Sequence, residues 1–163
     1  LNLWYINAII PKSSVFFGKT SEYNLFWDNK ENINRIMIKD FLIINCTGQN
    51  DKIGLKINNN FYIHEFQSKM KNNEILVKSI LNFTNKHKAK IDENFTILIN
   101  SGPGSFSTIR VALAVAKGIK ISKGAKLFSF KDADLPQLNP ENIEVLINKD
   151  LIEKKLIKPV YIS

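Results

Sequence analysis

The chain has 163 residues, a formal net charge of +8 and 44% hydrophobic residues. This length suffices for one domain, and the apolar content is that of an ordinary globular protein. No apolar run approaches the ~20 residues of a membrane span, and the single cysteine, Cys46, excludes an internal disulfide. We therefore expect a cytoplasmic protein without a membrane anchor, in which Cys46 is a small core or turn residue.

Residues 1–36 differ in pattern from the rest of the chain. Both tryptophans, Trp4 and Trp27, fall here, and no period of 2 or 3.6 organises the apolar residues. Met37 stands just ahead of the first convincing strand. We interpret residues 1–36 as an N-terminal extension. A misassigned start site is the favoured explanation, and an aromatic arm that docks on the domain or on a partner is the alternative.

From residue 41 onward the sequence predicts a regular order of strands and helices. Apolar runs and alternation predict strands, and an apolar stripe at helical spacing predicts each helix. The predicted strands are Phe41–Cys46, Ile53–Ile57, Phe61–Phe66, Phe95–Asn100 and Lys126–Phe130, and the helices are about 72–88, capped by Asn72 or Asn73, and 106–121. The order β-β-β-α-β-α-β is that of a ribonuclease H-like α/β domain, the building block of the actin and sugar-kinase superfamily. In the tail, Ile143–Asn148 and Val160–Ile162 are predicted as further strands.

The stretch from Asn100 to Arg110 is the most informative motif. It lies between a predicted strand and a predicted helix, so it predicts a glycine turn that leads into a helix N-terminus. Glycines with positive φ and a proline make such a turn tight, and a serine hydroxyl can cap the helix. The residues expected in these roles are Gly102 and Gly104, Pro103, and Ser105 or Ser107. The turn is either an anion site or a simple packing turn, and it lacks the lysine of a P-loop.

This motif resembles the GPGSFTGLR signature of the TsaB (YeaZ) family. The departures are Thr108 in place of glycine, Ile109 in place of leucine and the mild change to Ser107. The stretch Phe41–Thr47 is similar to the opening strand and turn of that family, and Pro159–Ile162 is similar to its closing tail. The signature-loop residues carried over by this resemblance are Gly102, Pro103, Gly104, Ser105, Phe106 and Arg110.

The resemblance implies a role in forming threonylcarbamoyladenosine in tRNA. Family members are accessory partners of a TsaD-like catalytic subunit, against which the two helices at about 72–88 and 106–121 pack. A TsaE-like ATPase is a possible further partner, and tRNA is reached indirectly through the complex. The expected interface residues are Leu76, Ile80, Ala112, Val115, Ala116 and Ile119, and of the two helix positions Ala114 and Ala116 the latter is expected nearer the partner.

The same resemblance implies a shortened chain. Family members usually continue with a second domain of comparable size, whereas only about thirty residues follow Phe130 here. We expect residues 37–131 to form the ribonuclease H-like domain and residues 132–163 to form a short tail in place of a much reduced second domain.

No constellation of residues points to catalysis, a metal or a cofactor. Asn45 stands where nucleotide-using relatives place an aspartate for Mg²⁺, and a neutral amide cannot supply that charge. His64 and His87 lack metal-ligand spacing, and no nucleophile–base pair supports proteolysis, although family members have been labelled glycoproteases. We expect a non-enzyme. The alternatives are a small phosphate- or nucleotide-binding protein that uses the loop Gly102–Ser107, and a homodimeric scaffold.

Lysines gather near the ends of both predicted helices. They recur as Lys86, Lys88 and Lys90 after the first helix and as Lys117, Lys120, Lys123 and Lys126 through the end of the second. Such clusters favour a polyanion such as tRNA. A solvated face whose lysines complement the helix dipoles is the equally weighted alternative.

Overall fold

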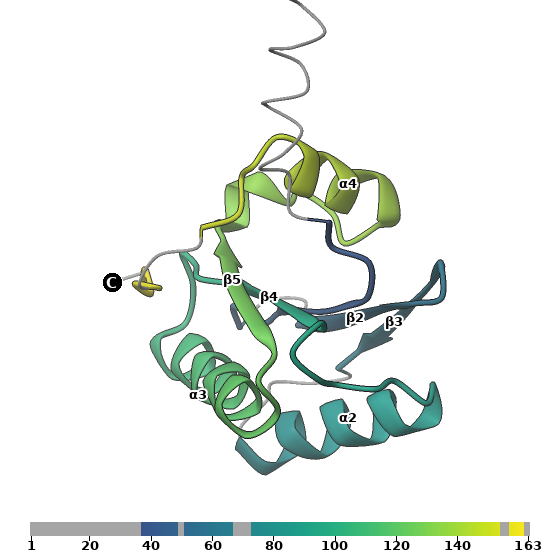
Figure 1. The fold of residues 1–163 in the computed structure, drawn as a ribbon. Coiled ribbons are helices and arrows are strands. Elements are labelled where there is room, and N and C mark those ends of the chain that lie inside the picture. Colours follow the sequence, from purple (N-terminus) through teal and green to yellow (C-terminus); the bar gives the residue numbers. More distant parts are fainter. Residues whose placement is uncertain (1–36, 49–50, 67–72, 154–156, 162–163) are drawn as a thin grey trace, which may run out of the picture. The chain divides into compact units, whose positions relative to one another are not determined.

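The computed structural model describes residues 37–48, 51–66, 73–153 and 157–161 (Figure 1). The chain divides into two units between Met37 and Ile38, and the fold described here is that of the second. The interpretation of residues 1–36 as an extension lies outside the described residues, as does the capping role considered for Asn72.

A five-stranded mixed sheet with the order β3-β2-β1-β4-β5 forms the centre of the domain. β1 pairs antiparallel with β2 and parallel with β4, β2 pairs antiparallel with β3, and β4 pairs parallel with β5. The strands are β1 (Phe41–Asn45), β2 (Lys52–Ile57), β3 (Asn60–Glu65), β4 (Thr96–Asn100) and β5 (Lys126–Phe130). This order and pairing confirm the predicted ribonuclease H-like α/β fold, with strand ends within one residue of the prediction.

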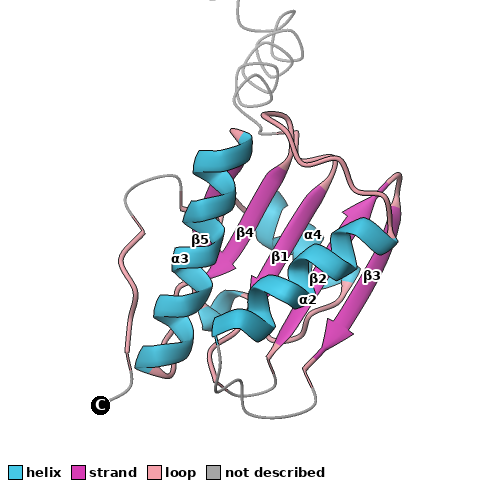
Figure 2. Cartoon of the chain, turned by 90° about the horizontal axis from the view of Figure 1, so that it is seen from below, coloured by secondary structure: helices cyan, strands magenta, loops and turns pink. Residues whose placement is uncertain are grey.

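Helices cover both faces of this sheet (Figure 2). α2 (Asn73–Lys86) and α3 (Phe106–Lys123) lie on one face, and α4 (Pro140–Asn148) lies on the other. Leu76 and Ile80 of α2 share one core cluster with Ala112 and Ala116 of α3 and with strand residues such as Ile44. β1 and β4 are buried because both of their faces are covered, which explains their continuous apolar sequences.

The helix α4 corrects the prediction of a strand at Ile143–Asn148. The side chain of Asn139 accepts a hydrogen bond of 2.8 Å from the backbone N–H of Asn142, and Pro140 occupies the start of the helix. These are helix-start signals. Ile143 and Leu146, three residues apart, are both buried, so the apolar residues form one helical face rather than an alternating strand.

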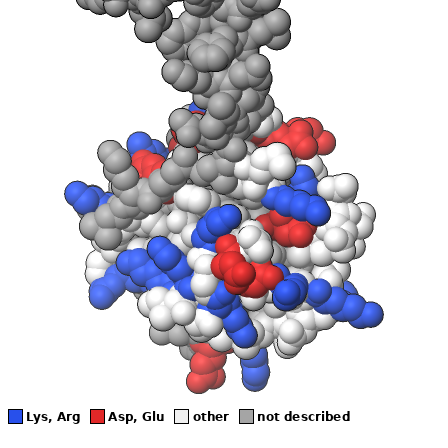
Figure 3. Space-filling model, viewed as in Figure 1, with Lys and Arg blue, Asp and Glu red and all other residues white. Residues whose placement is uncertain are grey.

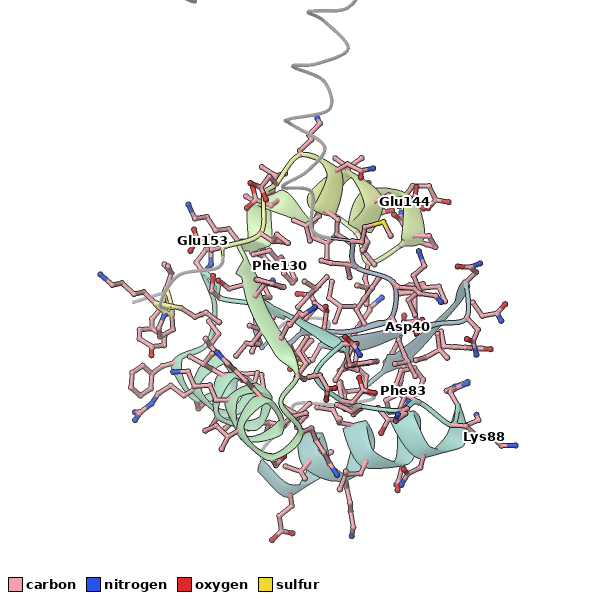
Figure 4. The ribbon with its side chains drawn as sticks, in the orientation of Figure 1. Asp40, Phe83, Lys88, Phe130, Glu144 and Glu153 are labelled. Atoms are coloured by element: carbon pink, nitrogen blue, oxygen red, sulfur yellow. The ribbon has the colours of Figure 1, made fainter. Side chains whose placement is uncertain are left out.

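The tail residues before the chain end contact the glycine turn. The backbone N–H of Val160 donates to the carbonyl oxygen of Ser101 at 2.8 Å, and Tyr161 forms a single parallel bridge with Gly104. The predicted strand Val160–Ile162 is therefore reduced to this bridge in the described residues, and Ile162 lies outside them. In Figure 4, Glu153 marks where the tail runs beside β5, and its backbone exchanges two hydrogen bonds with Ser129.

Candidate functional site

Gly102 requires glycine for two independent reasons. Its φ is +105°, a conformation that residues with a side chain rarely adopt, which confirms the predicted positive φ. A Cβ at this position would also overlap the carbonyl oxygen of Val160. Pro103, which follows, is exposed and lines the cavity described below. Gly102 therefore lets the tail pass directly over the end of β4.

Gly104 requires glycine because of close packing, and the predicted positive φ at this residue is wrong. A Cβ on Gly104 would lie 2.6 Å from both the Cβ and the carbonyl oxygen of Thr47, closer than real carbon contacts allow. The backbone of the glycine turn therefore passes directly against the turn that follows β1. The neighbouring residue Ser105 extends this contact, since its N–H donates to the Thr47 carbonyl at 2.7 Å.

Ser105 is the N-cap residue of α3, but its hydroxyl makes no cap hydrogen bond. Its Oγ lies 3.3 Å from the Oγ of Ser107 instead, so the predicted capping role of either hydroxyl is not realised. Ser105 contributes through its backbone, because its carbonyl oxygen accepts the first hydrogen bond of the helix from Ile109 at 3.0 Å. Both serines are exposed at the start of α3.

Phe106 and Arg110, the other two signature residues, lie on the surface of α3. The Phe106 ring is 53% exposed and lies 4.6 Å from the ring of Tyr161, centroid to centroid. The Arg110 guanidinium carbon stands 4.8 Å from the Phe106 centroid, in the geometry of a cation–π contact. The signature therefore joins the start of α3 to the tail through a surface cluster of Phe106, Arg110 and Tyr161.

Three polar side chains meet where the parallel strands end. The Nδ2 group of Asn100 donates to Oδ1 of Asn45 at 2.7 Å and to Oδ1 of Asp132 at 2.8 Å. Its own Oδ1 accepts from the backbone N–H of Gly102 at 2.9 Å, so the amide of this buried residue is well satisfied. Asn45 and Asn100 are the last residues of β1 and β4, and Asp132 lies just after β5. Sequence reasoning missed the roles of Asn100 and Asp132. The signal was their common place at the carboxyl edge of the sheet.

A cavity of about 790 Å³ opens beside these three side chains. It lies between the turn after β1, the start of α3 and the segment that leads into α4. Its lining residues are Asn45, Thr47, Gly48, Lys52, Pro103, Gly104, Ser105, Asp132, Leu135, Pro136, Gln137, Leu138 and Asn139. Its volume falls within the range of ligand pockets.

Four of the predicted partner-interface residues lie in the core of this chain. Leu76, Ile80, Ala112 and Ala116 are between 0% and 1% exposed, so their side chains have no surface to offer a partner. The expectation that Ala116 lies nearer the partner is corrected for the same reason, since Ala114 is the exposed alanine. Val115 and Ile119 are partly buried and pack against the edge of the core.

The described residues include one buried thiol and no cluster of metal-ligating side chains. Cys46 is buried, and burial together with the nearby Asp51 carboxylate raises the pKa of its thiol, which makes the reactive thiolate rarer. Within the described ranges, no group of three or more His, Cys, Asp and Glu side chains lies close enough to hold a metal ion. His64 and His87 both contact the ring of Phe83, at 5.8 Å and 5.1 Å. No helix in the described part is long and apolar enough to cross a membrane.

Solved structures of known proteins share this fold. YeaZ from Pseudomonas aeruginosa aligns with a TM-score of 0.55 and 14% identity over 60% of this chain and 46% of its own length. A second structure, of an uncharacterized protein similar to peptidase YeaZ from Pseudomonas aeruginosa, aligns with a TM-score of 0.54 and 14% identity over 60% of this chain and 45% of its own length. No family model matches the chain, and no curated protein matches it in sequence.

The chain aligns with less than half of the length of these YeaZ structures. At 14% identity the likeness establishes the fold. The described domain therefore has the ribonuclease H-like fold of YeaZ proteins, as the resemblance of the signature loop to the TsaB (YeaZ) family predicted.

Proposed function

We propose that this protein is a non-catalytic accessory subunit that binds and stabilises a TsaD-like catalytic subunit in the formation of threonylcarbamoyladenosine in tRNA. The YeaZ-like fold and the signature loop Gly102–Arg110 support this assignment. The observation that carries it is an exposed apolar flank on α2, next to α3, on the helical face of the sheet.

The exposed flank of α2 consists of Val77 and Leu81, one turn apart. They are 41% and 53% exposed, and with Glu74 and Lys78 they line an apolar hollow of about 390 Å³. The opposite flank of the helix faces β3, because Phe83 there lies 5.8 Å from the ring of His64 (Figure 4). Val77 and Leu81 therefore lie on the flank that faces α3 rather than β3.

The neighbouring helix α3 adds further apolar surface. Val111, Val115 and Ile119 recur every four residues along it and are only partly buried. Ala114 and Gly118, on its exposed side, are small enough for a partner helix to approach closely. Because exposed apolar patches mark interaction sites, we assign the partner face to Val77 and Leu81 of α2 together with Val111, Val115 and Ile119 of α3.

Two substitutions on opposite flanks of α2 test this face. Leu81→Glu places a charge on the proposed partner face, and we expect it to weaken capture of the TsaD-like subunit at least tenfold, about 1.4 kcal/mol. Ile75→Glu is the matched control, since Ile75 is 45% exposed on the other side of the same helix. Both variants should melt like the parent chain. Equal capture of the TsaD-like subunit by Leu81→Glu and Ile75→Glu would show that the subunit does not bind the assigned face.

A second copy of this chain is the competing occupant of the partner face. Light scattering after size-exclusion chromatography distinguishes the two. A parent dimer that Leu81→Glu converts into a monomer, without loss of TsaD capture, would support a homodimeric scaffold. Reconstituted tRNA modification that proceeds normally without this chain would contradict the accessory role itself. The same reconstitution includes a TsaE-like ATPase. In this proposal the complex as a whole brings tRNA to this chain.

The cavity supports a second candidate function, binding of a small phosphate compound or nucleotide at the loop Gly102–Ser107. Gly104 and Ser105 line it beside the N-terminus of α3, and Lys52 lines it from β2. Lys52 is engaged with Glu65 at 2.7 Å, so the cavity offers less free positive charge than a phosphate site usually has. Isothermal titration of the isolated chain with ATP and ADP tests this candidate, and an absence of heat at millimolar ligand would contradict it.

A further inference from the structure

The sequence from Asn94 to Lys131 contains no acidic residue. It spans β4, α3 and β5 and carries six basic residues, which are Arg110, Lys117, Lys120, Lys123, Lys126 and Lys131. Lys131 pairs with Glu153 at 3.7 Å, whereas the other five form no ion pair with another described residue. Solvated protein surfaces normally mix both signs of charge. The exposed part of this segment instead carries charge of one sign only.

The helix dipole accounts for only part of this positive charge. Lys120 and Lys123 lie in the last turn of α3, where cations stabilise the helix. Arg110 and Lys117 lie earlier in the helix, and Lys126 begins β5. Figure 3 shows basic side chains over the part of the molecule where α3 and β5 lie. Asp92, paired with Lys90 at 3.3 Å, and Glu93, beside Gly124, bound this face at the end of α3.

Arg110, Lys117 and the adjacent Lys120 share one flank of α3 with an exposed aromatic pair. Phe106, Arg110, Lys117 and Ile121 recur at helical spacing, so they lie on the same side of the helix. All four are exposed, and Ile121 is 85% exposed. This outer flank differs from the partner face, since Val111, Val115 and Ile119 lie on the side that packs against the core edge.

The aromatic pair at the start of this flank is held in place. Tyr161 is 38% exposed and contacts the Phe106 ring at 4.6 Å, and its backbone forms a bridge with Gly104. The hydrogen bond from Val160 to Ser101, at 2.8 Å, anchors the tail just before it. Two partly exposed rings next to the Arg110 guanidinium are suited to stack a nucleobase.

We propose that the outer flank of α3, from Phe106 and Tyr161 to Lys126, binds single-stranded nucleic acid. The lysines contact phosphates, and the ring pair stacks a base at the start of the helix. The 18 residues of α3 extend about 27 Å, enough for the smaller of the known single-strand sites, about 4 nucleotides. If the proposed function holds, the bound strand is RNA, and in this respect the inference rests on the proposed function.

Binding of the full chain to a labelled, unstructured RNA of about 12 nucleotides tests the inference without any partner protein. Fluorescence anisotropy from about 50 to 200 mM salt gives the dissociation constant and its salt slope. We expect Lys117→Glu/Lys120→Glu to weaken binding at least tenfold and to reduce the slope by about 1.4, the value for two lost single-strand phosphate contacts. Phe106→Ala should weaken binding about tenfold with an unchanged slope, because stacking releases no counterions.

The matched control is Lys78→Glu/Lys86→Glu on α2. It changes the net charge equally and also removes a lysine from the last turn of a helix. We expect its RNA affinity to stay within about threefold of the parent, because these lysines lie on α2, outside the proposed path of the strand along α3. Melting curves check that each variant is folded. Equal weakening by both double variants would overturn the inference, because it would indicate diffuse attraction by net charge.

Two further outcomes would also overturn it. The first is an absence of RNA binding by the parent chain at the lowest salt. The second is binding of a polyglutamate peptide as tight as that of RNA, which would identify an acidic protein as the partner. Comparing the affinity for DNA of the same sequence shows whether the flank prefers RNA or DNA. Capture of the TsaD-like subunit by Lys117→Glu/Lys120→Glu should be unchanged, so this inference and the proposed function can fail separately.

Discussion

The backbone N–H of Ser105 donates a hydrogen bond of 2.7 Å to the carbonyl oxygen of Thr47. This bond joins the start of α3 to the turn after β1, two segments far apart in the sequence. It forms only because Gly104 brings the backbone close to Thr47. The signature loop thus connects the ends of the parallel strands β1 and β4 to the start of α3. Substitution of its glycines tests this connection.

Gly104→Ala should destabilise the fold by about 1–3 kcal/mol, because the new Cβ would meet Thr47 at 2.6 Å and neither backbone can move freely. Gly118→Ala is the control within α3. Its Cβ would meet no atom within 4 Å, so the higher helix propensity of alanine should stabilise the fold by about 0.4–1 kcal/mol. Urea unfolding measures both free energies. A Gly104→Ala variant as stable as the parent would contradict the close approach of the two turns.

Ala116→Glu should unfold the domain or destabilise it by more than about 3 kcal/mol. Ala116 is 0% exposed, so the carboxylate would be buried without a partner. Ala114→Glu introduces the same side chain on the exposed side of α3 and should leave the melting temperature within a few degrees of the parent. Circular dichroism during heating distinguishes them, and similar melting of the two variants would show that the helix is rotated from its described orientation.

The order of strands and helices from Phe41 to Phe130 could be predicted because local patterns agree with the fold throughout. β1 and β4 are continuous apolar runs since both of their faces are covered, and α2 carries a clear buried stripe. The segment Ile143–Asn148 could not be assigned from its apolar residues alone, because short apolar runs suit both a strand and a helix. The decisive signal was the Asn139–Pro140 start, which the prediction did not use.

The candidate site was harder to predict than the fold, since its properties depend on distances between segments. A glycine at position 104 is compatible both with positive φ and with close packing, and only the position of Thr47 distinguishes them. Periodicity places Ala114 and Ala116 on different sides of α3 but does not say which side meets the sheet. The hydrogen bonds of Asn100 to Asn45 and Asp132 join residues 55 and 32 positions apart.

Asn139→Ala should destabilise the domain by about 1 kcal/mol, because it removes the hydrogen bond that caps α4 at the backbone N–H of Asn142. Asn139→Asp keeps an acceptor at the helix N-terminus and should retain most of that stability. Chemical denaturation of the three proteins compares the free energies of unfolding. Equal losses for the alanine and aspartate variants would indicate that packing of the side chain, rather than the cap, is responsible.

Asp51 should make the fold less stable as pH rises through its folded-state pKa. Burial is the largest influence and raises the pKa of this carboxyl above its usual value of 3.8, although hydrogen bonds from the backbone of Gly48 and Thr47 oppose the shift. The folded state then binds the proton more tightly than the unfolded chain, so stability falls with rising pH between the two pKa values. Asp51→Asn should therefore be more stable than the parent at neutral pH, with the difference shrinking as pH falls to 3.8 and below.

Asp92 should give the opposite dependence of stability on pH in the same unfolding measurement. The backbone N–H of Asn94 donates to its carboxylate at 2.9 Å and lowers its pKa, with Lys90 adding to the shift. The ionised form is favoured in the folded state, so its contribution is present above pH 3.8 and is lost as pH falls through the lower folded-state pKa. Asp92→Asn should thus be less stable than the parent at neutral pH, and this deficit should vanish in acid. Unfolding curves between about pH 3 and 7 compare the free energy of unfolding of both variants with that of the parent. If both variants were more stable than the parent at neutral pH, or both less stable, the assignment of burial to Asp51 and of backbone hydrogen bonding to Asp92 would be contradicted.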